Sequence, residues 1–221
     1  MLESVTVKVP ATTANMGPGF DCLGMALDIW NTIQVELGPF EINIIGEGHD
    51  ILSLGRSNLV YRGVKLALEQ SGRESVEVSI KSDNGIVLSR GLGSSAAALV
   101  GGLVAGNEIC GRPLSDSDLL SLAVEEEGHP DNVVPALLGG CTIVVNDRGR
   151  LITSQVSVPD DLQMVAFIPD VPIPTSKARS LLSREIDRQD AVYNIGRVGL
   201  LINAFSSRNY DHLSTATQDR I

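Results

Sequence analysis

Aromatic residues are scarce in this chain, and so are basic ones. Phe, Tyr and Trp together make up 4% of 221 residues, although 43% of the residues are hydrophobic. The chain is therefore long and apolar enough to bury a core, and that core must consist mainly of aliphatic side chains and alanine. Only 17 Lys and Arg oppose 27 Asp and Glu, which gives a net charge of −10. This balance argues against nucleic acid or an anionic membrane as a partner.

Cysteine pairs and long apolar runs are also missing. Cys22, Cys110 and Cys141 lie far apart without a CxxC spacing, so the sequence predicts neither a disulfide framework nor a zinc site. No apolar run approaches the roughly 20 residues that a membrane helix needs. Acidic Glu3 does not suit a signal peptide. We therefore expect a soluble protein of a reducing, cytoplasmic compartment with no membrane partner.

The apolar patterns predict an α+β protein with a mixed sheet. Alternating or β-branched runs predict strands at 4–9, 26–37, 41–45, 75–80, 86–88, 141–146 and 162–168. Helical patterns occur at 58–69, 94–110, from 115 onward, 130–138, 176–182, 191–206 and near 210. Pro10 should end the first strand, and Ser57 and Ser115 should cap helices. We place a domain boundary near residue 150, between domains of residues 1–150 and 151–221.

The strongest chemical signal is a glycine-rich segment that leads from the strand-like run at 86–88 into an Ala-rich helix. It reads Ser89-Arg90-Gly91-Leu92-Gly93-Ser94-Ser95. Glycines let backbone N–H groups approach an anion, and the first N–H groups of a helix lack internal partners and carry the positive end of its dipole. We interpret the segment as a phosphate-binding loop with a serine hydroxyl free to ligate Mg²⁺. A structural turn followed by a helix cap is the alternative.

Other phosphate loops fit less well. A Walker A loop needs a lysine where Ser94 follows the last glycine. The spacing Gly91-x-Gly93-x-x-Ala96 satisfies a loose dinucleotide-binding pattern, but a helix, not a second parallel strand, is expected from Pro113 onward. The protein-kinase loop is also a poor match because neither H-R-D nor D-F-G follows.

Three segments resemble the superfamily of galacto-, homoserine, mevalonate and phosphomevalonate (GHMP) kinases, in that family's order. They are VPATTANMGPGFDCLG at 9–24, GLGSSAA at 91–97 and EGHPDNVVPA at 127–136, and the first is similar to homoserine kinases in particular. The resemblance implies a ribosomal-S5-like N-terminal domain and a ferredoxin-like C-terminal domain. It also implies ATP-dependent phosphorylation of the side-chain hydroxyl of L-homoserine, a step leading to threonine, and by analogy a homodimer.

The sequence departs from the family pattern at two places. Val87 stands where homoserine kinases commonly have proline, and the family's last Gly-rich motif is absent. We therefore expect an incomplete C-terminal domain. Two alternatives stay open at this point: a superfamily kinase for another small alcohol, and a catalytically inactive nucleotide-binding fragment.

The resemblance also implies the residues of the site. ATP is expected at Asn58 and at Val87, Leu88, Ser89, Arg90, Gly91, Leu92, Gly93, Ser94, Ser95, Ala96 and Ala97. Mg²⁺ is expected at Ser95 and Glu127, which with Asn132 form the catalytic group. Homoserine is expected at Asn15, Asp21, His129, Asp131, Thr175 and Arg179.

Several of these residues have a structural alternative. Glu127 ends an acidic run that could be a solvated helix face. Asp131 and Asn132 are residue types that often cap helices, and Asn58 could merely begin one. Arg179, four residues after Thr175 and so on the same helix face, could be an ordinary surface residue.

No dedicated strong base is visible. The first segment lacks the lysine that mevalonate kinases carry there. We expect the substrate hydroxyl to attack the γ-phosphate directly and to lose its proton late, with positioning and electrostatic stabilisation supplying the catalysis. Asp21 or His129 as general base is the alternative.

Overall fold

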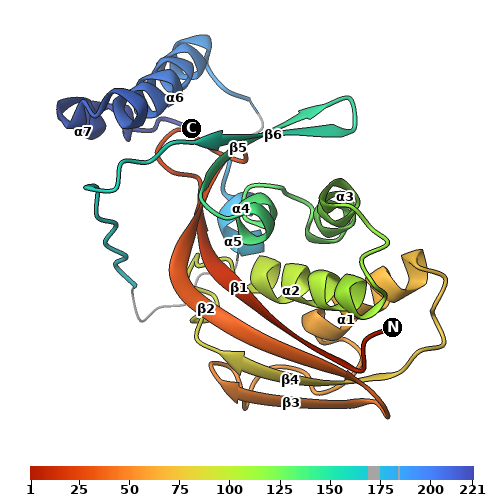
Figure 1. The fold of residues 1–221 in the computed structure, drawn as a ribbon. Coiled ribbons are helices and arrows are strands. Elements are labelled where there is room, and N and C mark those ends of the chain that lie inside the picture. The colour runs from red at the N-terminus through yellow and green to blue at the C-terminus, as the bar shows by residue number, and fades with distance from the viewer. Residues whose placement is uncertain (169–174, 184) are drawn as a thin grey trace.

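A computed structural model describes residues 1–168, 175–183 and 185–221. Six strands in this part of the chain form one sheet, with helices α1 to α4 packed on one of its faces (Figure 1). The strands are β1 (Ser4–Ala14), β2 (Leu23–Leu37), β3 (Glu41–Gly46), β4 (Val78–Asn84), β5 (Cys141–Asp147) and β6 (Arg150–Val156). Their order is β3-β4-β2-β5-β6, and β1 also pairs with β2. Only β3 and β4 run parallel, so the predicted mixed sheet is confirmed.

The helices follow the predicted order. They are α1 (Leu59–Gln70), α2 (Ser94–Ile109), α3 (Asp116–Glu127), α4 (Val133–Leu138), α5 (Thr175–Ser180), α6 (Arg188–Ser207) and α7 (Leu213–Ala216), with a 3₁₀ turn at Tyr210–His212. Helix α2 lies at the centre, against β1 and α1, and its glycines permit this closeness. A Cβ on Gly102 would lie 2.2 Å from the carbonyl oxygen of Val60. The low helix propensity of these glycines is therefore offset by the close contact that they allow between the backbones of α2 and α1.

Two apolar clusters hold the elements together. The larger one fills the space between the sheet and α1 to α4, with aliphatic residues such as Ile33, Leu99 and Leu103 fully buried. The smaller one joins α6 and α7 to β5, β6 and the start of β2 through residues that include Leu201 and Phe205. No helix in the described part of the chain is both long and apolar enough to cross a membrane.

Three local predictions at the N-terminal half were wrong. Strand β1 does not end at Pro10 but continues to Ala14, because a register shift between Pro10 and Ala11 accommodates the missing N–H. Residues 86–88 form no strand: the Ile86 N–H donates to the side chain of Asn31 and not to the backbone of a neighbouring strand. Ser57 does not cap α1; the Asn58 side chain does.

Farther along the chain, one local prediction is confirmed and one is wrong. Ser115 caps α3, as predicted, and the structure adds that it does so in a capping box with Asp118. The run 162–168 is not a strand: Val165 and Phe167 are more than 90% exposed. The strand that pairs with β5 across the charged turn is β6, which begins directly after it. The division near residue 150 stays a prediction, and Arg150 begins β6, directly after the turn of the β5–β6 hairpin.

Candidate active site

A cleft of about 520 Å³ opens beside the glycine-rich segment. Its walls come from the start of α1, the loop before α2, the first turn of α2 and the segment that connects α3 to α4. The predicted residues that line it are Asn15, Asn58, Leu88, Ser89, Arg90, Gly91, Leu92, Gly93, Ser94, Ser95, Glu127, His129 and Asn132. This volume is within the usual range of small-molecule sites.

The glycine-rich segment has the backbone expected of an anion site. Ser89, Gly91 and Gly93 all have positive φ, and Gly93 directly precedes α2. Within the described residues no side chain caps this helix, so its first N–H groups are not used up by a capping oxygen. Ser94 and Ser95 lie at the cleft, which favours an anion site over a capped structural turn.

Not every residue of the predicted segment presents its side chain to the cleft. Ala96 and Ala97 are buried in the core, and Val87 packs against it. Neither alanine lines the cleft, and the Ala97 N–H already donates to the Gly93 carbonyl oxygen at 2.8 Å.

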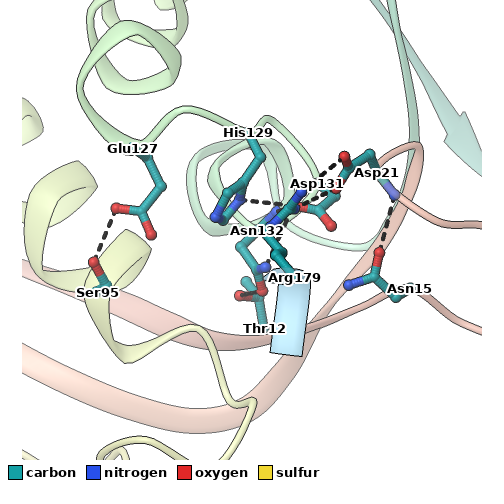
Figure 2. Close-up of polar contacts among 9 residues, drawn as sticks. All are labelled: Thr12, Asn15, Asp21, Ser95, Glu127, His129, Asp131, Asn132 and Arg179. Carbon is teal, nitrogen blue, oxygen red and sulfur yellow. Dashed lines mark hydrogen bonds and ion pairs between the residues drawn. The ribbon is translucent and has the colours of Figure 1, made fainter. Parts of the chain in front are cut away.

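The two predicted magnesium ligands meet at one end of the cleft (Figure 2). The Ser95 hydroxyl donates to Glu127 Oε2 at 2.9 Å, so the last turn of α3 and the first turn of α2 face each other there. Glu127 is half-buried and hydrogen-bonded, which does not fit a purely solvated face.

A hydroxyl and one carboxylate suit Mg²⁺, which commonly takes its remaining ligands from water and substrate phosphates. The described residues contain no group of three or more His, Cys, Asp or Glu side chains that could hold a metal by themselves. The donor set therefore fits a magnesium ion that arrives with a nucleotide.

Asp131 organises the segment between α3 and α4. It is 1% exposed, and its Oδ1 lies 3.1 Å from His129 Nδ1 and 3.0 Å from the Asn132 backbone nitrogen. The hydrogen bond that the His129 ring makes to the Asp131 carboxylate raises the pKa of His129, although partial burial of the ring opposes this. Asp131 Oδ2 is buried without a hydrogen-bond partner among the described residues, so it can still accept a bond from a ligand.

The Asn132 side chain makes a contact that sequence reasoning missed. It precedes α4, but in the described structure it forms no capping bond; its Oδ1 accepts a 2.8 Å hydrogen bond from the Thr12 hydroxyl. The capping alternative is therefore wrong for this side chain. Thr12 reaches Asn132 because β1 continues past Pro10. Because we expected the strand to end at Pro10, the sequence did not predict that Thr12 lies next to Asn132.

Asn15, Asp21 and Arg179 form a second polar group beside the cleft (Figure 2). Asn15 Oδ1 accepts from the Asp21 N–H at 2.9 Å, and both residues have φ near +56° to +57°. The Arg179 guanidinium donates to both Asp21 oxygens, one at 3.0 Å, and the pKa of Arg179 is raised by this bond. Arg179 is thus not an ordinary surface residue. Thr175 begins α5, but its side chain lies outside the described residues.

Asn58 lines the cleft and also begins its helix. Its Oδ1 accepts from the N–H groups of Val60 and Tyr61, and its Nδ2 donates to the Ser53 carbonyl at 2.8 Å. Most of its hydrogen-bonding capacity therefore shapes the cleft wall, and one amide hydrogen remains for a ligand.

The fold and this cleft define a small-molecule kinase of the GHMP class. The family profile described as "GHMP kinases N terminal domain" matches residues 58–140, which include the glycine-rich segment and the Ser95–Glu127 pair.

Comparison with whole proteins is more specific. The homoserine kinase of Clostridium botulinum (strain Langeland) is 43% identical over 217 residues, which span 98% of this chain and 72% of that protein. The homoserine kinase of Desulfitobacterium hafniense is 44% identical over 218 residues, with 98% and 73% covered. The crystal structure of homoserine kinase from Cytophaga hutchinsonii matches 100% of this chain and 73% of its own, with a TM-score of 0.84 and 30% identity. The chain belongs to the homoserine kinase family.

Proposed function

We propose that this protein transfers the γ-phosphoryl group of ATP to the side-chain hydroxyl of L-homoserine, giving ADP and O-phospho-L-homoserine. The observation that carries the proposal is one cleft with two kinds of polar group. The anion-binding loop and the Ser95–Glu127 pair line it together with Asn15, His129 and Asn132, and the last two contact the buried Asp131 carboxylate. Membership in the homoserine kinase family supports the choice of substrate.

The ATP phosphates belong at the glycine-rich segment and the first turn of α2. There the N–H groups of Ser94 and Ser95 and the helix dipole offer positive charge in a protein whose net charge is −10. Ser95 and Glu127 would hold Mg²⁺, which when bound neutralises charge on the β- and γ-phosphates. Both residues lie on helices that the core fixes, so their separation is preorganised.

L-Homoserine belongs beside the Arg179–Asp21 ion pair. Its carboxylate suits the Arg179 guanidinium, and its ammonium group suits the Asp21 carboxylate or the free Asp131 Oδ2. A zwitterionic substrate bound there would replace the Arg179–Asp21 ion pair by two ion pairs, one between its carboxylate and a cation and one between its ammonium group and a carboxylate. A substrate without an ammonium group would leave the carboxylates uncompensated.

The phosphoryl transfer needs no strong side-chain base. His129 holds its Nδ1 against Asp131, and Asn132 carries an amide that does not titrate. The homoserine oxygen would therefore form its bond to Pγ while the bond from Pγ to the β,γ-bridging oxygen breaks. The hydroxyl proton passes late to an oxygen of the transferred phosphoryl group. By analogy with the family, we also propose that the protein is cytoplasmic, has two domains and forms a homodimer.

The test is a coupled assay of ADP release with ATP, Mg²⁺ and, in turn, L-homoserine, mevalonate and L-serine. It is run on this chain and on the longest form that its gene encodes. We expect turnover with L-homoserine and at least tenfold lower kcat/KM with the other two alcohols. Preferential turnover of another alcohol would refute the substrate, and ATP binding without any phosphorylation would refute the enzyme.

A further inference from the structure

Thr12 is a buried hydroxyl residue with two contacts that link separate parts of the site. Its side chain is 0% exposed, and its Oγ1 lies 2.8 Å from Asn132 Oδ1 (Figure 2). Its backbone N–H donates to the carbonyl oxygen of Leu92 at 3.1 Å. One residue of β1 thus contacts the phosphate loop through its backbone and the segment before α4 through its side chain.

The surroundings determine which way the Asn132 amide faces. Asn132 Nδ2 lies 3.4 Å from Asp131 Oδ1, and a carboxylate can only accept, so the NH₂ group belongs on that side. The carbonyl oxygen then faces Thr12, whose hydroxyl must donate to it. An amide nitrogen has two hydrogens, and Asp131 takes one of them. The second remains for a ligand in the cleft that Asn132 lines.

The phosphate loop closes over this hydrogen bond. A Cβ on Gly93 would lie 1.8 Å from Thr12 Oγ1 and 3.0 Å from Asn132 Oδ1. The hydroxyl therefore fits under the loop only because residue 93 is glycine. This close packing leaves the Thr12 hydroxyl little room to turn away from Asn132.

We propose that Thr12 is a positioning residue, whose hydroxyl fixes the Asn132 side chain with its NH₂ group available to the cleft. Without this hydroxyl the amide can rotate and present its carbonyl oxygen to the phosphoryl group, which repels it. The effect on turnover rests on the proposed function, whereas the orientation of the amide is a property of the protein without ligands.

The kinetic test compares Thr12→Val with Thr12→Ser. Valine keeps the shape and removes the hydroxyl, and serine keeps the hydroxyl. We expect Thr12→Val to lower kcat about tenfold, equivalent to about 1.4 kcal/mol, with KM for ATP and L-homoserine within about twofold of wild type. Thr12→Ser should recover most of the rate. Thr13→Val makes the same change on the opposite face of β1 and should leave kcat unchanged.

A double-mutant cycle shows whether Thr12 acts through Asn132. Adding Thr12→Val to Asn132→Ala should lower kcat less than twofold, because the group that Thr12 orients is already gone. Equal losses in both backgrounds would overturn the proposal, and so would a Thr12→Val enzyme with wild-type kcat.

A ligand-free measurement separates the inference from the proposed function. The Nδ2 resonances of Asn132 in ¹⁵N-edited NMR spectra, assigned by their loss in Asn132→Ala, should shift or broaden in Thr12→Val but not in Thr13→Val. Unchanged resonances would overturn the proposal even in an active kinase. If wild type does not phosphorylate L-homoserine, the proposed function fails, and these resonances alone decide the role of Thr12.

Discussion

Replacing Gly93 by alanine tests the packing on which the site geometry depends. Gly93 has φ +63°, a conformation that costs a residue with a Cβ about 1 kcal/mol. The new Cβ would also lie 1.8 Å from Thr12 Oγ1, so the hydroxyl must leave Asn132. Breaking a buried hydrogen bond and leaving its groups unpaired costs about 1–3 kcal/mol more. We expect Gly93→Ala to lower the free energy of unfolding by about 2–4 kcal/mol in urea denaturation.

Gly91→Ala is the matched control. Gly91 also has a left-handed backbone, with φ +71°, but a Cβ there would meet no atom of the described residues within 4 Å. Its substitution should cost only the backbone conformation, about 1 kcal/mol. The effect of alanine on the unfolded chain is common to both variants and cancels in their difference. Equal losses of stability in the two variants would refute the contact between the phosphate loop and Thr12.

Three further substitutions test individual groups. Glu127→Gln should lower kcat about tenfold or more and raise the Mg²⁺ concentration at half-maximal rate; an unchanged Mg²⁺ dependence would exclude Glu127 as a ligand. Arg179→Ala should raise KM for L-homoserine about tenfold or more because a charged hydrogen bond is lost, with a smaller change in kcat. Arg179→Lys should recover part of the loss. An unaltered KM would show that the substrate carboxylate binds elsewhere. Asp131 raises the pKa of His129 above its ordinary 6.5, so this group stabilises the fold fully below pH 6.5 and loses that contribution as pH rises through the folded-state pKa. His129→Gln should therefore flatten the dependence of unfolding free energy on pH just above 6.5, and an identical slope in wild type and variant would contradict the His129–Asp131 bond.

The pattern of apolar and polar residues was sufficient to predict the mixed sheet and most of the helices. Ser115 and Asp118 mark the start of α3 because a capping box is a local interaction. The prediction of a strand at 162–168 was wrong because apolar alternation does not reveal whether a partner strand exists. β6 occupies the edge of β5, and residues such as Phe167 are left exposed.

The candidate site was predicted where residue chemistry is distinctive. The glycines, Ser95 and Glu127 carry a recognisable chemistry, and the structure brings the last two into contact. Thr12 carries no charge and no characteristic spacing, so nothing local marks it. Its placement depends on a strand that passes through Pro10 by a register shift, which is a tertiary feature. The Asp21–Arg179 pair joins residues 158 positions apart, which only the folded chain reveals.

The most direct test of the central claim is a proton-coupled ³¹P NMR spectrum of the reaction of ATP, Mg²⁺ and L-homoserine with this protein. Transfer to the side-chain hydroxyl predicts a new phosphate monoester signal, split into a triplet by the two protons of the adjacent CH₂ group, that grows as ADP forms. Release of inorganic phosphate alone, or a new phosphate signal without that splitting, would contradict it.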